Sequence, residues 1–378
     1  MRVIQARLNS ETQLRIAFLA SGMTGHLDGA LRALVEERDV ELFIITRRFR
    51  DNVDYAPLPI ETRVPVMSWV DDPDPAELIA AVREFEPDAI LVHSWHVKPY
   101  RSVMRSFRGE ALRVLFMDNN WLETPKQWLG RFTSSVYIQP LFDLVFLPGD
   151  RTEAFARRLG FSGENVIRGS YTADTPLFGR DPVPGDELAR RGRFVSVLRM
   201  VEHKGADVLA DAYRLYRARV AEPWDLELVG IGPLLGKFDD VPGVIKHGFL
   251  QPPEVASLMH RSSCYINPSR EEAYGVVLHE ATAAALPILT SDLVGAAPTL
   301  VQDGYNGWCV PSGQADHLAD AMARVSRLDA VRLGEMSAAS HAISQRLSPS
   351  IWARNLYEEL DRRLSSVLQR SSSGDASG

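Results

Sequence analysis

Residues 264–285 read C-Y-I-N-P-S-R-E-E-A-Y-G-V-V-L-H-E-A-T-A-A-A, and this stretch decides the fold class of the chain. Residues 264–269 have the length and apolar content of a buried strand, and residues 276–285 have the pattern of a helix. Gly275, between them, lets the backbone pass close to a bound group. A short apolar strand followed at once by a helix is the unit from which parallel sheets are built.

The same alternation extends in both directions along the chain. Further strands are expected at 14–20, 40–46, 89–94, 113–118, 144–149, 165–170, 193–198, 226–231, 244–249 and 286–291. Helices are expected between them, at 26–37, 75–85, 151–160, 206–220 and 253–262. Short apolar strands that alternate with helices of this length predict βαβ units and a parallel sheet in each half of the chain.

The domain organisation follows from length and from one proline-rich segment. A chain of 378 residues is long for one hydrophobic core, so two doubly wound α/β domains are expected. Residues 171–192 contain several prolines and turn formers, which indicate a linker. The predicted parts are an N-terminal Rossmann-like domain, a linker, a C-terminal Rossmann-like domain, a helix that packs back toward the N-terminal domain, and a disordered tail (1–175, 176–192, 193–347, 348–370 and 371–378). Two such domains face each other across a cleft, where this architecture binds ligands.

Composition excludes several classes of protein. A hydrophobic fraction of 45% is ordinary for a globular chain, and a net charge of −7 leaves no basic excess to neutralise nucleic acid. The N-terminal segment M-R-V-I-Q-A-R-L-N-S-E-T-Q lacks the apolar core of a signal peptide, and no apolar run reaches the ~18–20 residues that span a bilayer. A cytoplasmic protein is therefore expected. Cys264 and Cys309 lie in apolar surroundings and are expected to be buried and reduced.

Two glutamates flank the predicted start of the helix at 276–285. Glu272 lies in the turn before the helix, and Glu280 lies one turn beyond Val276 on the same face. The amides of Tyr274, Gly275 and Val276 suit an anion such as phosphate, and a carboxylate that accepts two hydrogen bonds suits a vicinal diol. Together they predict a site for a nucleotide sugar. The alternatives are a glutamate that stabilises the helix dipole and a solvated helix residue.

Several segments resemble the motifs of one enzyme family. Residues 272–280, E-A-Y-G-V-V-L-H-E, followed by A-T-A-A-A-L-P-I-L-T-S, resemble the signature of retaining glycosyltransferases of family GT4, which have the GT-B fold. Three further segments resemble the family's motifs in the expected order: S-V-L-R-M-V-E-H-K-G (196–205), V-G-I-G-P-L (229–234) and V-Q-D-G-Y-N-G-W-C-V-P-S-G (301–313). The resemblance covers most of residues 190–345 and is weaker over the N-terminal half.

The resemblance implies roles for single residues in the C-terminal half. Arg199 and Lys204 match the pair that binds the donor diphosphate, and Gly230 belongs to a matched donor-binding segment. Glu272 is expected to hold the transferred sugar and Glu280 the ribose. Cations fixed beside a departing diphosphate stabilise the transition state more than the ground state. A surface Arg–Lys pair near a helix start is the alternative.

The N-terminal half carries the other candidate residues. Residues 19–34 resemble the family's glycine-rich loop, in which Gly25 is expected to approach the donor and Thr24 to cap a helix. A plain turn has the same pattern. Where the family commonly has a histidine near the transferred sugar, this chain has Asp118, a candidate catalytic residue. His93 and His96 follow another strand and are expected in the core or at its rim.

The activity is implied by the resemblance. Members transfer a sugar with retention, so we expect a hexose-type unit to move from a UDP- or GDP-sugar to a sugar or lipid-linked acceptor, in polysaccharide or glycolipid biosynthesis. No metal or other cofactor is expected, because arginine, lysine and a helix dipole neutralise the donor. A nucleotide-sugar 2-epimerase and a non-catalytic nucleotide-sugar-binding subunit remain alternatives. The departures from the family pattern at Asp118 and Thr299 would fit the second alternative.

A basic stripe in the N-terminal half bears on the acceptor. Residues 96–113 place four cations at helical steps of three and four: Lys98, Arg101, Arg105 and Arg108. Their apolar neighbours are Tyr100, Val103, Met104 and Phe107. A basic amphipathic helix of this kind predicts peripheral contact with an anionic membrane surface, where a lipid-linked acceptor is presented. A solvated helix face is the alternative.

Overall fold

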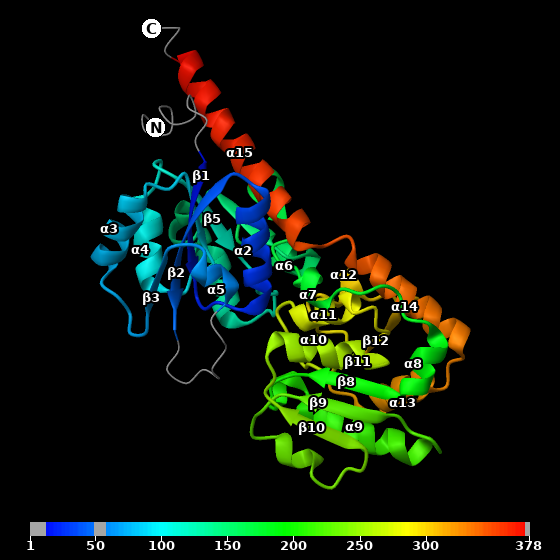
Figure 1. Ribbon diagram of the computed structural model, residues 1–378. Coiled ribbons are helices and arrows are strands. Elements are labelled where there is room, and N and C mark those ends of the chain that lie inside the picture. The colour runs from blue at the N-terminus through cyan, green and yellow to red at the C-terminus, as the bar shows by residue number, and fades with distance from the viewer. Residues whose placement is uncertain (1–12, 49–57, 375–378) are drawn as a thin grey trace. The chain divides into compact units, whose positions relative to one another are not determined.

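The stretch at 264–285 forms a strand, a turn and a helix: β11 (Cys264–Asn267) and α11 (Val276–Ala283). The structure is a computed structural model that describes residues 13–48 and 58–374 (Figure 1). The described residues form two units: unit 1 contains the chain up to Thr172 and the chain from Pro349 on, and unit 2 is Ala173–Ser348. The predictions that the chain starts without a signal peptide and ends in a disordered tail fall largely on 1–12 and 375–378, outside the described residues.

Unit 1 is built on a parallel sheet of seven strands in the order β3-β2-β1-β4-β5-β6-β7. These strands are β1 (Leu14–Ala20), β2 (Val40–Arg47), β3 (Val66–Trp69), β4 (Ala89–Val92), β5 (Leu112–Phe116), β6 (Leu144–Leu147) and β7 (Val166–Arg168). The strand order reverses between β1 and β4, which is the ligand-binding switch point of a doubly wound sheet.

Helices cover both faces of this sheet, so its strands are apolar on both sides. The helices of unit 1 are α2 (Gly25–Glu37), α3 (Pro75–Phe85), α4 (Lys98–Ser106), α5 (Pro125–Tyr137), α6 (Asp150–Arg158) and α15 (Pro349–Gly374). Successive residues of β1 enter different cores: Ile16 and Phe18 pack with α2 and α15, and Ala17 and Leu19 pack with α3 and α4 (Figure 1). This alternation is the two-residue period of a strand.

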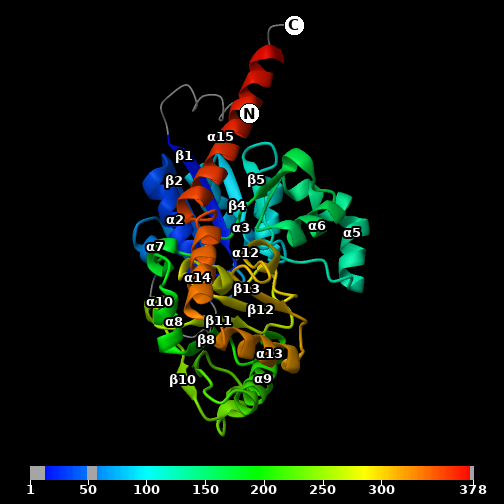
Figure 2. The ribbon, with the colours of Figure 1, turned by 90° about the vertical axis from the view of Figure 1, so that its right-hand side faces the viewer.

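The closing helix α15 is part of unit 1. It runs along α2 and buries four apolar residues in the core beneath: Trp352, Ala353, Leu356 and Leu360 (Figures 1 and 2). The indole of Trp352 donates a hydrogen bond to the carbonyl of Ser170 at 2.9 Å. The helix continues to Gly374, so residues 371–374, predicted as disordered tail, are helical. No helix of the described residues is both long enough and apolar enough to cross a membrane.

Unit 2 repeats the same plan with a parallel sheet of six strands in the order β10-β9-β8-β11-β12-β13. The remaining strands are β8 (Arg193–Val197), β9 (Asp225–Val229), β10 (Val244–Gly248), β12 (Ile288–Ser291) and β13 (Gly307–Val310). The main helices besides α11 are α9 (Ala206–Arg219), α10 (Pro252–His260), α12 (Ala297–Leu300), α13 (Ala315–Ser326) and α14 (Ala330–Ser344). Two Rossmann-like α/β units are therefore confirmed. Cys264 is buried, Cys309 is half-buried, and both are free thiols.

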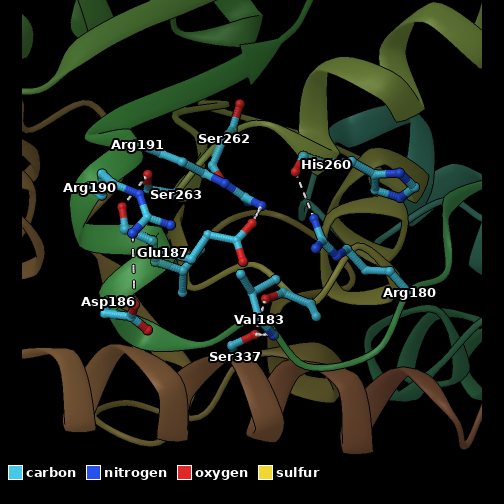
Figure 3. Close-up of polar contacts among 12 residues, drawn as sticks. Arg180, Val183, Asp186, Glu187, Arg190, Arg191, His260, Ser262, Ser263 and Ser337 are labelled. Carbon is cyan, nitrogen blue, oxygen red and sulfur yellow. Dashed lines mark hydrogen bonds and ion pairs between the residues drawn. The ribbon is translucent and has the colours of Figure 1, made fainter.

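The segment predicted as a linker, 176–192, is folded and belongs to unit 2. It contains most of α7 (Thr175–Phe178) and all of α8 (Gly185–Arg191), and Val183 and Leu188 are buried. Several hydrogen bonds tie it to the rest of the unit, among them Arg180 Nη1 to the His260 carbonyl (2.6 Å), the Val183 amide to Ser337 Oγ (2.7 Å) and Arg191 Nη1 to the Ser262 carbonyl (3.1 Å) (Figure 3). Prolines and turn formers here mark short helices packed on unit 2, because the polar groups between them find partners within that unit.

Candidate functional site

The donor-site residues predicted in unit 2 follow the carboxyl ends of neighbouring strands. Arg199 follows β8, Gly230 follows β9, and Glu272 follows β11. Lys204 ends the short 3₁₀ helix η4 (Glu202–Lys204) before α9. Because β9, β8 and β11 are adjacent and parallel, their carboxyl ends lie at one edge of the sheet, where doubly wound folds bind ligands.

Glu272 is held by three donors. Its Oε1 accepts a charge-assisted hydrogen bond from Lys204 Nζ at 2.6 Å. Its Oε2 accepts hydrogen bonds from Ser269 Oγ at 2.8 Å and from Asn267 Nδ2 at 3.2 Å. The side chains of Lys204 and Glu272 are 18% and 16% exposed, so the ion pair lies at the surface edge of the unit and not in its core. Asn267 and Ser269 were not predicted, although they stand just before Glu272 in the quoted stretch.

Arg199 is connected to the same turn through His203. Its Nη2 lies 3.2 Å from His203 Nε2, and the carbonyl of His203 accepts the amide of Arg270 at 2.9 Å. Arg270 in turn forms a two-point contact with Asp207 at the start of α9, at 2.6 and 2.8 Å. Hydrogen bonds to Arg270 hold the pKa of Asp207 below its usual range. The turn that carries Glu272 is thus fixed to the loop that carries Arg199 and Lys204.

The start of α11 offers backbone amides. Gly275 precedes the helix with φ +90°, and a Cβ there would lie 2.9 Å from Val294 Cγ1 and 3.3 Å from Glu272 Cδ. No side chain caps the helix. The amide of Leu278 donates to the carbonyl of Gly275 at 2.9 Å, and the amides of Val276 and Val277 precede the first acceptor within the helix. Tyr274 is buried beside this turn. Gly275 is therefore required both for the backbone conformation and for the space next to Glu272.

Position 230 requires glycine for a different structural reason. Its φ is +127°, and a Cβ would lie 1.9 Å from the carbonyl oxygen of Leu198. The close approach of the chain segments after β8 and β9 thus requires glycine, whatever the segment binds.

Glu280 differs from Glu272 in its surroundings. Burial, and then the nearby carboxylate of Asp174, raise its pKa to about 8. The pKa of Tyr265 on β11 is raised well above its usual value by burial first, and then by both Glu272 and Glu280. Glu280 is therefore largely neutral at pH 7, where a carboxyl group donates one hydrogen bond and accepts others.

Unit 1 has its own cluster at the carboxyl ends of β1, β4 and β5. Asp118 Oδ2 accepts a hydrogen bond from the Tyr171 hydroxyl at 3.0 Å. The Tyr171 ring stacks on His26 with centroids 4.9 Å apart. His93 Nδ1 lies 3.1 Å from Ser21 Oγ, and the charge of Asp118 acts on the His93 ring. The predicted Asp118 is thus brought together with His93, which was expected only in the core or rim.

The two histidines of this cluster are uncharged at neutral pH. Burial, and then His93, lower the pKa of His26 to about 3. Burial also lowers the pKa of His93, although Asp118 opposes the shift. Gly25 is the first residue of α2, next to His26. Thr24 occupies the cap position, but its hydroxyl contacts His26 Nδ1 at 3.0 Å, so the predicted side-chain cap is not formed.

The predicted membrane helix has its apolar side inside unit 1. The apolar neighbours of its cations are all buried: Tyr100, Val103, Met104 and Phe107. The core of unit 1 takes the apolar side of this helix, so only its cations could face a membrane, and peripheral membrane contact stays a prediction. α4 also ends at Ser106, so Arg108 lies beyond the helix. In 13–48 and 58–374, no three His, Cys, Asp or Glu side chains are grouped to hold a metal ion.

Known proteins match the C-terminal half by sequence. Residues 191–327 match the family model of glycosyl transferases group 1. The amylovoran biosynthesis glycosyltransferase AmsK of Erwinia amylovora is 28% identical over 190 residues, which cover 47% of this chain and 46% of AmsK. A GDP-mannose-dependent alpha-(1-6)-phosphatidylinositol monomannoside mannosyltransferase of Mycobacterium tuberculosis is 31% identical over 183 residues, covering 43% of this chain and 47% of that protein. The chain thus spans about half the length of these curated relatives.

The whole fold also has solved counterparts. HepE of Anabaena, in complex with UDP and glucose, superposes with a TM-score of 0.71 at 18% identity, over 93% of this chain and 100% of that one. A likeness at this identity shows the fold alone. Residues 191–327 are therefore similar to group 1 glycosyl transferases, and the chain has the GT-B fold.

Proposed function

We propose that this chain is a retaining glycosyltransferase that moves a hexose-type sugar from a UDP- or GDP-sugar to a sugar or lipid-linked acceptor. Its relatives are named for amylovoran biosynthesis and for the mannosylation of a phosphatidylinositol monomannoside, which places the proposal in polysaccharide or glycolipid assembly. The solved HepE complex contains UDP and glucose. The observation that carries the proposal is the Lys204–Glu272 ion pair beside the uncapped start of α11.

The donor diphosphate is neutralised by the protein. Lys204 and Arg199 supply two cations, and the amides at the start of α11 supply hydrogen bonds to phosphate oxygens. As the bond between the sugar and the diphosphate breaks, negative charge grows on the departing oxygen, and these groups stabilise it. The proposal assigns this role to the protein without a metal, and it predicts that activity persists in EDTA.

The two glutamates hold the sugars of the donor. Glu272, fixed by Asn267 and Ser269, is oriented to accept hydrogen bonds from the hydroxyls of the transferred sugar. Glu280 holds the ribose, because a neutral carboxyl pairs with a diol as donor and acceptor at once.

Retention follows if the acceptor attacks from the side that the diphosphate leaves. The bond from the anomeric carbon to the phosphate oxygen breaks, and the bond to the acceptor oxygen forms on the same face. The acceptor proton passes to the departing phosphate oxygen, so no protein base is consumed. Asp118, held by Tyr171, contacts the transferred sugar or the acceptor in this proposal.

The test is nucleotide release from a panel of nucleotide sugars, with and without a membrane extract as acceptor source. Release that depends on the acceptor supports transfer. Release without any acceptor would instead identify a 2-epimerase, and donor binding without release would identify a binding subunit. The anomeric configuration of the product, read by NMR, tests retention.

A further inference from the structure

Helix α5 presents its largest apolar side chains to solvent. Six of the twelve large hydrophobic residues that are exposed among the described residues lie in this helix or just before it. These six define the α5 face: Leu122, Trp128, Leu129, Phe132, Val136 and Tyr137. Phe132 is 74% exposed, Val136 69%, Leu129 65% and Tyr137 63%. The only buried residue of α5 is Ser134.

The α5 face is one stripe, fixed in place by the opposite side of the helix. Trp128, Phe132 and Val136 are spaced four residues apart, so they lie above one another on one side. Ser134, on the inner side, donates to the carbonyl of Leu159 at 2.6 Å. Helices of globular proteins normally turn such a stripe toward the core, and a contiguous exposed patch marks a binding surface.

Cations are concentrated on the two helices α4 and α5. α4 and α5 together carry five cations and no acidic residue, in a chain whose net charge is −7: Lys98, Arg101, Arg105, Lys126 and Arg131. Arg131 lies over the rings of Trp128 and Phe132, 5.2 and 6.0 Å from their centroids. The nearest acids in sequence are Glu110 and Glu123, and Glu110 is paired with Arg83 at 2.9 Å.

α4 and α5 join in a single surface. Arg105 and Arg108 share a recess of about 260 Å³ with Val136 and Tyr137 at the end of α5. Lys126, at the start of α5, and Arg101, on α4, both lower the pKa of His96 after burial does, which puts these cations close together. α4 therefore supplies charge and α5 supplies exposed apolar area. α5 lies at the periphery of unit 1 (Figure 2).

We propose that the α5 face is the surface by which unit 1 docks on an anionic lipid bilayer. The apolar side chains enter the interface between headgroups and acyl chains, and the flanking cations contact lipid phosphates. A second copy of the chain fits less well, because a two-fold contact would bring the same cations against each other. Membrane docking requires neither the nucleotide-sugar donor nor Glu272, so this inference can be tested independently of the proposed sugar transfer.

The test is co-sedimentation of the full chain with phosphatidylcholine vesicles, with and without phosphatidylglycerol. We expect binding to the vesicles that contain phosphatidylglycerol, weakened by salt. Leu129→Ser with Phe132→Ser should lower the affinity by about tenfold or more, since both side chains leave water on docking. The matched control is Val331→Ser, which changes a residue that is 73% exposed in unit 2. Arg105→Gln with Arg108→Gln should reduce the preference for phosphatidylglycerol.

Three outcomes would overturn the inference. The first is no binding of the unaltered chain to either kind of vesicle. The second is equal binding by the Leu129→Ser/Phe132→Ser variant, with an unchanged circular dichroism spectrum to show that it is folded. The third is a dimer in light scattering that this variant dissociates, which would make the α5 face a contact between copies. Glu272→Gln should bind vesicles as the unaltered chain does.

Discussion

The two clusters of polar residues at strand ends lie on sheets of the same strand order, but one consists mainly of charged groups and the other mainly of uncharged groups. In unit 2 the cluster is made of ions: Lys204 with Glu272, Arg270 with Asp207, and an exposed Arg199. In unit 1 it is made of imidazoles that burial keeps neutral, together with Asp118, which accepts a hydrogen bond from Tyr171. The first arrangement suits an anionic diphosphate and the second suits uncharged hydroxyl groups. The difference is one of surroundings and not of fold.

The largest effect is expected at Glu272. Glu272→Gln removes the charge that Lys204 pairs with but keeps the shape, so turnover should fall by roughly 10²–10³-fold while donor affinity changes little. Steady-state nucleotide release gives the turnover, and calorimetry gives donor binding. Glu271→Gln is the matched control, because Glu271 is the exposed neighbour in the same turn. Undiminished turnover in Glu272→Gln would show that the unit 2 cluster does not take part in transfer.

A substitution at Arg199 tests whether the cations of the unit 2 cluster bind the donor diphosphate. Arg199→Ala should weaken donor binding by about 10–100-fold and lower turnover as well, because a charge-assisted contact to phosphate is lost in both ground and transition states. Arg190→Ala is the control, since Arg190 is an exposed arginine of the same unit, paired only loosely with Asp186 at 3.9 Å. Equal donor affinity in the two variants would remove Arg199 from the diphosphate site.

A substitution at Asp118 tests the role of the unit 1 cluster. Asp118→Asn keeps a hydrogen-bond acceptor for Tyr171 but removes the charge in the neutral cluster. Turnover should fall by about tenfold, less than the roughly 10²–10⁴-fold of a general acid or base, because Asp118 transfers no proton in the proposed reaction, while UDP or GDP affinity stays unchanged. A loss of nucleotide affinity in this variant would contradict the division of labour between the two clusters. Asn119→Ala, at the next and exposed position, is the control.

The smallest effect concerns stability and pH. The pKa of Glu280 is about 8 in the folded protein against 4.5 for an ordinary glutamate, so the folded state holds the extra proton between these pH values. Stability therefore falls as pH rises through this window, and Glu280→Gln removes the loss. The melting temperature of Glu280→Gln relative to the unaltered protein should rise from pH 5 to pH 8, by about 2–4 °C for each kcal/mol of the loss. The buried histidines titrate in both proteins and cancel in the difference, so a difference independent of pH would show that Glu280 is not desolvated.

The sequence predicts most of the sheets because their strands are continuous apolar runs. β1 is found to the residue, as Leu14–Ala20. β3 (Val66–Trp69) was missed because it is partly polar and only partly buried. β13 (Gly307–Val310) was missed because it begins with a glycine and follows the turn formers D-G-Y-N. α5 was also missed, although Trp128, Phe132 and Val136 recur every four residues, which is the pattern of an amphipathic helix.

The candidate site divides in the same way. Residues 196–205 and 264–285 carry almost the whole unit 2 cluster in two short segments, so sequence motifs find it. The unit 1 cluster joins Ser21, His26, His93, Asp118 and Tyr171, which only the fold brings together. The glycine-rich loop predicted Gly25, the residue before His26, but no motif in the neighbouring sequence indicated Tyr171. The raised pKa of Glu280 depends on burial and on Asp174, and Asp174 belongs to none of the sequence motifs.

The central claim is that a donor diphosphate binds beside Lys204 at the start of α11, and nucleotide titration calorimetry tests it most directly. The comparison is UDP against UMP, and GDP against GMP, in the unaltered protein and in Lys204→Met. We predict that the diphosphate of at least one pair binds more tightly than its monophosphate, and that Lys204→Met abolishes most of this difference. An undiminished preference for the diphosphate in Lys204→Met, or no preference in the unaltered protein, would contradict the account.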